Sequence, residues 1–270
     1  MLPWLLLLVL PSAYSLNCSY VFDGKHYARE SILTMDDIPS HLQIHPTTNN
    51  LIFSLVNSKF SFTGHIYILR NGTPVKVDIK DAQVAATDYE HHNVFIGTKN
   101  GIKLLNSQNK ALLDFVSLRN ENIVRLFKPT ADDKLFAITY PNRTVYQLDL
   151  NVFEKSEVKL EPNLYDVVVD EEGNIFYHTI SRDLKVLLKG FNEPIKFVGL
   201  DAHCRGLTID NNDRVIAIMN NGLYWLKPDS MIPKKLMDLD FDPKSVLFAC
   251  EDMYISTNNT IYKFSNNDCQ

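Results

Sequence analysis

Short apolar runs separated by polar turns recur along this chain with a period of about 40 residues. Aligned on one strand of the repeat, the central residues of six copies lie 38 to 43 positions apart: Ile52, Phe95, Phe136, Phe176, Ile216 and Tyr254. A second apolar track keeps the same register at Ile66, Ile102, Val145, Leu184, Leu223 and Ile261. A fixed period of short strands and turns is typical of a propeller with one four-stranded blade per repeat. The pattern therefore predicts an all-β chain folded as a six-bladed β-propeller.

The two ends of the chain are predicted to meet in the last blade. The sixth repeat stops after its third strand at Phe264, and residues 28–35 have the pattern of the missing outer strand. We expect this N-terminal strand to complete the last blade and close the ring. Closure also makes Cys18 and Cys269 the best candidates for a disulfide. Cys204 and Cys250 fall near opposite ends of inner strands in adjacent blades, so their pairing stays open.

The first fifteen residues indicate export. They hold no charge, contain an apolar core from Leu5 to Leu10, and end in Ala13-Tyr14-Ser15, a small-x-small site that suits signal peptidase. A membrane anchor would need roughly 20 apolar residues, and this core is about half as long. We expect residues 1–15 to be a signal peptide and residues 16–270 to form one secreted propeller domain. Four Asn-x-Ser/Thr sequons fit a secreted glycoprotein: Asn17, Asn71, Asn142 and Asn258.

Charge and composition restrict the possible partners. The formal net charge is −5, and no run of five or more Lys and Arg residues is present. A nucleic acid or an anionic membrane surface is therefore not expected as a partner. One closed propeller uses the whole mature length, so we expect a single domain and a monomer.

Motifs for common enzyme chemistry are missing from the sequence. There is no Gly-x-Ser-x-Gly elbow, no phosphate-binding glycine loop, no His-Glu-x-x-His and no Cys-x-x-Cys. Glu90-His91-His92 could hold a metal, but it falls in a turn of the second repeat, where a solvated turn is the better interpretation. The sequence thus favours a protein that is not an enzyme and has no metal or cofactor.

Polar and charged residues begin the inner strand of each blade, where propellers face their central channel. The candidate ligand-binding residues are His41, Arg125, Tyr165, Asp166, His203, Arg205 and Lys244. Any one of them could simply line a wet channel. As a set, cations and rings around one carboxylate suit a planar, anionic aromatic ligand, through charge-assisted hydrogen bonds and stacking.

Two stretches of the repeat resemble the gluconolactonase and regucalcin-like superfamily of six-bladed propellers. They are residues 165–176 (YDVVVDEEGNIF) and residues 205–214 (RGLTIDNNDR). In those enzymes Glu, Asn and Asp on inner strands hold a divalent metal, and the aligned positions here are Asp166 and Arg205. A cation in the place of a metal ligand argues for a propeller that binds rather than catalyses.

Within such propellers the chain more closely resembles, over nearly its whole length, the ommochrome-binding proteins of insect haemolymph. The similarity rests on a signal peptide, a Cys just inside the mature end, the strand LQIHPTTNNLIF (residues 42–53), and a Cys-containing end after TIYKF (residues 260–264). It implies a haemolymph carrier of a tryptophan-derived pigment such as xanthommatin, a fused planar ring system with carboxylates. Under this hypothesis Arg125, Arg205 and Lys244 pair with carboxylates, and Tyr165 and His203 stack or donate to ring atoms.

Two other functions remain open at this stage. One is a metal-dependent lactonase or esterase of the gluconolactonase-like superfamily, which would need a bound divalent ion. The other is an extracellular propeller that binds proteins, which would need a large exposed apolar patch on one face.

Overall fold

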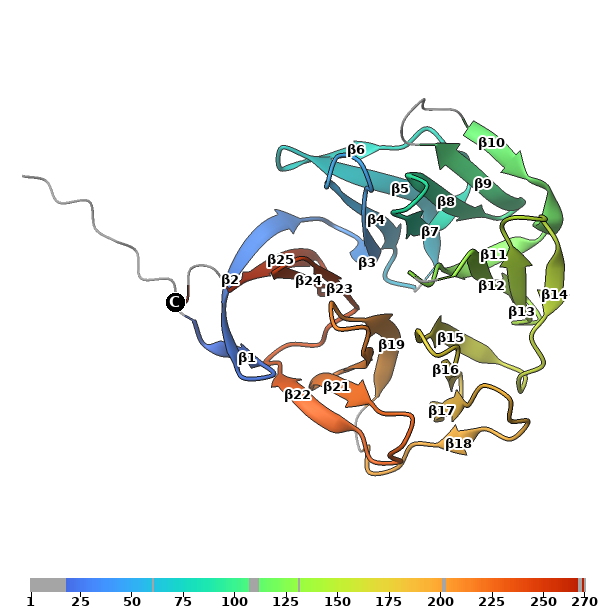
Figure 1. Cartoon of the computed structure of the whole chain (residues 1–270). Helices are drawn as coiled ribbons and strands as arrows, with labels where there is room; N and C mark the ends of the chain where they lie inside the picture. The colour runs from blue at the N-terminus through green and yellow to red at the C-terminus, as the bar shows by residue number, and fades with distance from the viewer. Residues whose placement is uncertain are drawn as a thin grey trace, which may run out of the picture.

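In a computed structural model, which describes residues 18–59, 61–106, 112–130, 132–200, 203–266 and 269, six sheets are arranged around a central axis (Figure 1). Each sheet is an antiparallel blade, and its strands follow one another from the axis outward. The prediction of an all-β, six-bladed propeller is confirmed.

The first three blades contain four strands each in the order of the sequence. Their bounds are β3 (Ile38–Ile44), β4 (Leu51–Val56), β5 (Phe62–Arg70) and β6 (Thr73–Lys76) in blade one; β7 (Ala82–Asp88), β8 (Asn93–Thr98), β9 (Gly101–Asn106) and β10 (Leu112–Phe115), followed by the short 3₁₀ turn η1 (Val116–Leu118), in blade two; and β11 (Asn122–Phe127), β12 (Lys134–Tyr140), β13 (Val145–Asp149) and β14 (Lys155–Glu157) in blade three.

Blades four and five repeat this plan, and blade six departs from it. The bounds are β15 (Leu164–Val169), β16 (Ile175–Thr179), β17 (Leu184–Leu187) and β18 (Ile195–Lys196) in blade four; β19 (Cys204–Ile209), β20 (Val215–Met219), β21 (Gly222–Leu226) and β22 (Lys234–Asp238) in blade five; and β23 (Ser245–Ala249), β24 (Asp252–Ser256) and β25 (Thr260–Ser265) in blade six, which is completed by β2 (Lys25–Thr34) and β1 (Tyr20–Phe22).

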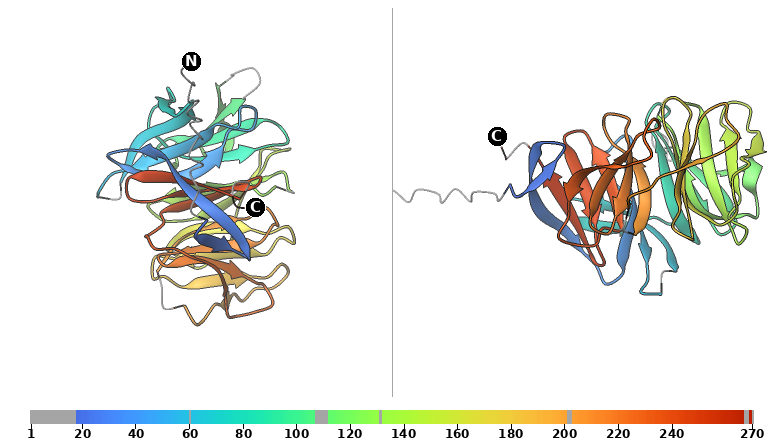
Figure 2. Two further views of the ribbon diagram at one scale, coloured as in Figure 1. Left: turned by 90° about the vertical axis from the view of Figure 1, so that its left-hand side faces the viewer. Right: turned by 90° about the horizontal axis from the view of Figure 1, so that it is seen from below.

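The N-terminal strand closes the ring, as the sequence predicts. β2 runs antiparallel to β25, with Ala28 opposite Ser265 and Thr34 opposite Thr260. Figure 2 shows β2, in blue, lying across the outside of the C-terminal strands, in red. The disulfide between Cys18 and Cys269 is also present, with a Cα separation of 5.8 Å. Cys204 and Cys250 are both free.

The hydrophobic core lies between the blades. The described residues form six apolar clusters, and each one joins two neighbouring blades. Inner and middle strands are thus covered on both faces, which explains why they read as continuous apolar runs instead of an alternating pattern. Strand β7, for example, is buried along its whole length. In the described part of the chain, no helix is both long enough and apolar enough to cross a membrane.

Candidate functional site: a cationic pocket in the central channel

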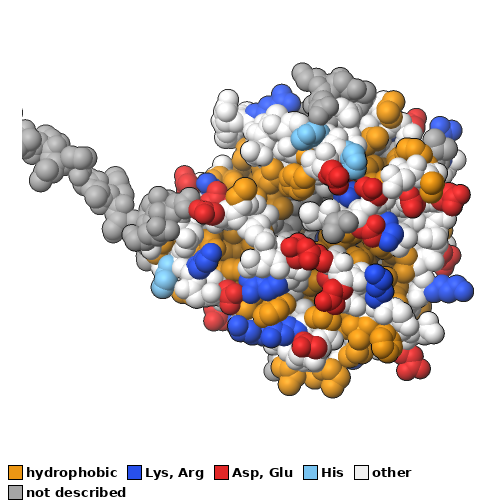
Figure 3. Space-filling model, viewed as in Figure 1, with side chains coloured by type: hydrophobic (Ala, Val, Ile, Leu, Met, Phe, Trp, Pro, Cys, Tyr) orange, Lys and Arg blue, Asp and Glu red, His pale blue; other side chains and the backbone are white. Residues whose placement is uncertain are grey.

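A cavity of about 550 Å³ opens among the inner strands of blades one, three, four, five and six. Six of the seven predicted ligand-binding residues line it: His41, Arg125, Tyr165, Asp166, Arg205 and Lys244. A smaller cavity of about 270 Å³ lies between the turns of blades three to five and contains none of them. The face shown in Figure 3 carries acidic side chains around the hollowed centre of the ring.

β-bulges direct several of these side chains into the channel. The ladder between the two innermost strands shifts register near the start of the inner strand in each of blades one to five. Tyr165 and Arg205 are the extra, unpaired residues of the bulges in blades four and five. A bulge bends its strand and re-aims a side chain, so these residues project from the sheet instead of packing between blades.

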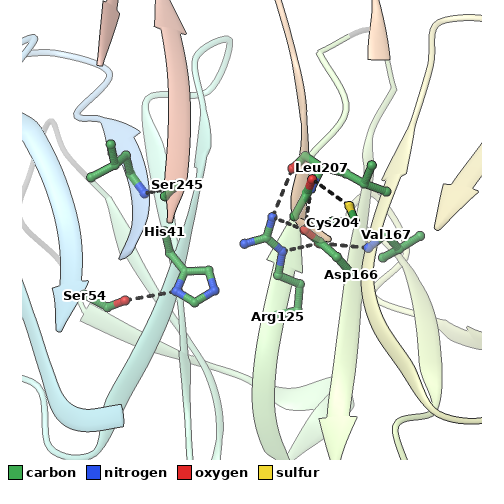
Figure 4. Close-up of polar contacts among 10 residues, drawn as sticks. His41, Ser54, Arg125, Asp166, Val167, Cys204, Leu207 and Ser245 are labelled. Carbon is green, nitrogen blue, oxygen red and sulfur yellow. Dashed lines mark hydrogen bonds and ion pairs between the residues drawn. The ribbon is translucent and has the colours of Figure 1, made fainter. Parts of the chain in front are cut away.

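Asp166 joins three blades through its carboxylate. Arg125 donates to it from Nε and from Nη2, the latter at 2.8 Å from Oδ2. The backbone N–H groups of Val167 and Leu207 donate to Oδ1 and Oδ2, each at 2.8 Å. Figure 4 shows this group on the wall of the channel opposite His41. The Asp166 side chain is only 3% exposed, and Gly206 permits the approach, since a Cβ there would lie 3.1 Å from Oδ2.

The other two predicted cations also have partners within the protein. Arg205 donates to the two oxygens of Asp242 at 2.9 and 2.8 Å, and Lys244 donates to Oδ2 at 2.6 Å. Burial alone would raise the pKa of Asp242, but the hydrogen bonds from Lys244 and Arg205 outweigh it and hold the pKa below its ordinary value. These cations are therefore fixed in place before any ligand arrives.

His41 is a neutral imidazole on the opposite wall. Its backbone is left-handed, with φ 51°, inside the bulge of β3, and its Nδ1 lies 3.1 Å from the hydroxyl of Ser54. The ring packs on Phe62 with 5.4 Å between centroids. Burial, followed by the positive charge of Arg125, holds the pKa of His41 well below the usual value of 6.5. His41 can therefore donate or accept one hydrogen bond but brings no charge.

His203 does not belong to the pocket. It is exposed, and both of its ring nitrogens lie within reach of Arg182 Nη1, Nδ1 at 2.9 Å. The bulge in β19 begins only after Cys204, so the channel position of blade five goes to Arg205. The expectation that His203 stacks on a ligand in the pocket is therefore corrected.

Arg143 lines the pocket and was missed by the sequence analysis. It lies in the turn between β12 and β13, with φ 56°, instead of on an inner strand. Its guanidinium carbon is 6.0 Å from the ring centre of Tyr140 and 5.8 Å from that of Tyr165. These two tyrosines are 52% and 49% exposed. Among the described residues Arg143 has no carboxylate partner, which distinguishes it from Arg125, Arg205 and Lys244.

The pocket does not fit a divalent cation. Asp166 is the only carboxylate among its lining residues, and both oxygens already accept hydrogen bonds from Arg125 and from backbone N–H groups. The guanidinium and ammonium groups that surround Asp166 would also repel a divalent metal ion. Cys204 offers no thiolate either, because burial raises the pKa of its thiol to about 12.

Comparison with known proteins identifies the fold. No family model and no curated sequence matches the chain. Among solved structures, it is similar to a gluconolactonase from Xanthomonas campestris, with TM-score 0.72, 9% identity, and coverage of 91% of this chain and 90% of that one. A luciferin-regenerating enzyme matches with TM-score 0.64 and 12% identity over 88% and 95% of the two chains. Virginiamycin B lyase from Staphylococcus aureus, as an inactive variant with quinupristin, matches with TM-score 0.59 and 9% identity over 88% and 99%.

These structures confirm a six-bladed propeller that resembles gluconolactonase-like proteins. The expectation that the chain is not an enzyme is corrected, since the similar structures named above are enzymes and the fold therefore does not argue against catalysis. The missing sequence motifs were a weak basis for that expectation, because a propeller brings together channel residues from distant repeats.

Acidification is expected to destabilise the fold through the buried side chain of His178. Burial lowers the pKa of His178, which is 3% exposed and whose ring centroid lies 4.8 Å from that of Tyr165. A His with a depressed native pKa binds more protons when unfolded, so stability falls as the pH drops below about 6.5. Calorimetry should show a lower unfolding midpoint at pH 5 than at pH 7. His178→Phe should reduce that difference, and an unchanged difference would contradict the role of His178.

Proposed function

We propose that this protein is a secreted carrier that binds a planar, anionic aromatic molecule of the ommochrome type, such as xanthommatin, in the channel pocket. One observation supports the proposal above the others: the pocket has an excess of positive charge next to exposed rings. Four cations line it, and two carboxylates, Asp166 and Asp242, bond three of them. Counting these side chains, two positive charges remain uncompensated in a protein whose formal charge is −5.

The position of Arg143 supports the ligand chemistry in more detail. A guanidinium with no carboxylate partner can bond a ligand carboxylate through two parallel N–H groups. Tyr140 and Tyr165 flank it and offer faces on which a planar ring can stack. The opposite wall is less polar, with Phe62, Ile38 and Val56 around the neutral His41. A volume of about 550 Å³ lies within the range of small-molecule sites.

Secretion, glycosylation and haemolymph as the location belong to the same proposal. The disulfide between the ends of the chain is compatible with an oxidising compartment. Three sequon asparagines, Asn71, Asn142 and Asn258, are exposed in turns between strands, where a glycan would disturb no packing. The fourth, Asn17, and the expected signal peptide at residues 1–15 lie outside the described residues.

Titration with xanthommatin tests the proposal. We expect a saturable shift of its visible absorption band and quenching of protein fluorescence at one ligand per protein. Arg143→Gln should weaken binding by about tenfold or more, because it removes one charge-assisted contact with a carboxylate. Arg182→Gln is the matched control, since Arg182 contacts His203 outside the pocket and should leave the affinity unchanged.

Two results would contradict the carrier proposal. One is the absence of a saturable shift in protein shown to be folded by circular dichroism. The other is equal loss of affinity in the Arg143 and Arg182 variants, which would point to unspecific charge effects. A lactone-hydrolysis assay on the same preparation, with and without a divalent ion, tests the metal-dependent lactonase as the alternative.

A further inference from the structure

The turn between β7 and β8 meets the turn between β11 and β12 of the next blade. Residues 89–92 form the first turn, and Asp133 lies in the second, directly before β12. Donor atoms of Glu90 and His91 from blade two and of Asp133 from blade three all lie within 4.8 Å of one another. The sequence analysis judged Glu90-His91-His92 to be a solvated turn. The structure adds a third donor from a residue more than forty positions away in the chain.

His91 is held by a buried carboxylate. Its Nδ1 lies 3.0 Å from Oδ2 of Asp88, and its backbone N–H donates to Oδ1 of the same residue at 3.3 Å. The Asp88 side chain is 2% exposed, whereas that of His91 is 50% exposed. When Nδ1–H donates to a carboxylate, the lone pair of the imidazole is left on Nε2. Metal-binding histidines in proteins commonly donate from the other ring nitrogen to a carboxylate in this way, which fixes the orientation of the ring and its tautomer.

Asp133 is also held by its neighbours. Oδ2 accepts a hydrogen bond from the side-chain amide of Asn151 at 3.1 Å, and the backbone carbonyl accepts one from the N–H of Leu150 at 2.8 Å. No hydrogen bond to Oδ1 is found within the described part of the chain. Glu90 is exposed and can adjust its rotamer. The set therefore combines two donors in fixed surroundings with one adaptable donor.

We propose that Glu90, His91 and Asp133 bind a divalent transition-metal ion of the Zn²⁺ class between blades two and three. Imidazole with carboxylates is a donor set for such ions, and the two carboxylates neutralise the charge of a dication. Zinc bonds to nitrogen and oxygen are about 2.0–2.2 Å long, so the three donors need to approach a common centre by less than about 1 Å. Water completes the coordination on the exposed side. The site is separate from the channel pocket and does not depend on the ligand proposed there.

Calorimetric titration of Zn²⁺ into the full chain, stripped with a chelator, tests the site. We expect one binding event and a rise of the thermal unfolding midpoint, since the ion binds the folded state and links two blades. His91→Asn and Asp133→Asn should abolish both. Asp88→Asn should weaken the affinity by about 10- to 100-fold, although Asp88 is not itself a ligand.

His92→Asn is the matched control, because it removes an imidazole from the adjacent position of the same turn and is expected to keep the affinity. The visible spectrum of bound Co²⁺ gives a second readout, which should change in the Asp88 variant and stay the same in the His92 variant. The proposal is overturned if the protein takes up no Zn²⁺, if the His91 variant binds as well as the natural chain, or if the His92 variant loses binding to the same degree.

Discussion

Replacing Asp166 with Asn is expected to destabilise the protein by about 3–5 kcal/mol. The substitution keeps the size of the side chain but removes the negative charge that Arg125 faces, and the Arg125 side chain is only 19% exposed. An unpaired guanidinium would then remain in the channel wall. The new amide would also place a donor next to the N–H groups of Val167 and Leu207. The free energy of unfolding in urea measures the loss.

Asp242→Asn provides the comparison for this variant. Asp242 is also an aspartate bonded by an arginine through two hydrogen bonds, but its side chain is 34% exposed. Water can solvate Arg205, whose side chain is 35% exposed, whereas the other partner, Lys244, is 13% exposed. We therefore expect a smaller loss, of about 1–2 kcal/mol. Adding Arg125→Met to Asp166→Asn should recover part of the larger loss, because it removes the unpaired charge. Equal losses for the two aspartates would show that burial does not decide the effect.

Removing the disulfide is expected to cost up to about 5 kcal/mol. Cys18 and Cys269 are 251 residues apart, so the bond closes nearly the whole chain into one loop and strongly restricts the unfolded state. In the folded state, the pairing of β2 with β25 already holds the ends together. The double variant Cys18→Ser, Cys269→Ser should therefore keep its fold but unfold at a lower urea concentration.

Cys250→Ser is the control for the disulfide variant. Cys250 is free and exposed, so its replacement should change the free energy of unfolding by less than about 0.5 kcal/mol. If the double variant is as stable as this control, the loop-closure argument does not hold for the protein. Circular dichroism of both variants before denaturation separates a loss of stability from a loss of structure.

The fold could be predicted from the sequence because it repeats. Each blade supplies its own apolar track, and residues such as Phe136 and Phe176 lie at equivalent places in successive sheets. The closing strand was predictable for the same reason, since the sixth repeat lacks an outer strand that residues near Ala28 supply. Periodicity thus determined the order, number and closure of the blades.

The site was predictable only in part, because bulges and turns do not follow the repeat. The channel position of Tyr165 was expected, although a bulge at that residue places it there. In blade five the equivalent bulge, at Arg205, brings that side chain into the pocket and leaves His203 outside. Arg143 was missed because it belongs to a turn between middle strands. In the sequence, Arg143 is marked only as a cation in a polar turn with tyrosines at positions 140 and 146. This pattern is too common to identify Arg143 as a pocket residue.

The internal partners of the cations were also beyond the sequence. Arg125 and Asp166 come from different blades, and Asp242 precedes the strand that begins at Ser245. Side-chain pairs across a channel depend on how far each blade is rotated about the axis, which no local pattern records. The sequence analysis expected Arg125, Arg205 and Lys244 to pair with carboxylates of the ligand. In the structure, the carboxylates of Asp166 and Asp242 bond these three cations.

Closure of the sixth blade by β2 sets the order in which the chain can finish folding. A ribosome releases β2 near the beginning of synthesis and β25 at its end. The first residues of β2 can pair with β1, but residues 28–34 stay without their partner strand while the first five blades are being made. These blades can form one after another as their strands emerge. The ring itself can close only after β25 has been translated, and a chain truncated before Thr260 would leave residues 28–34 of β2 without the strand that they pair with.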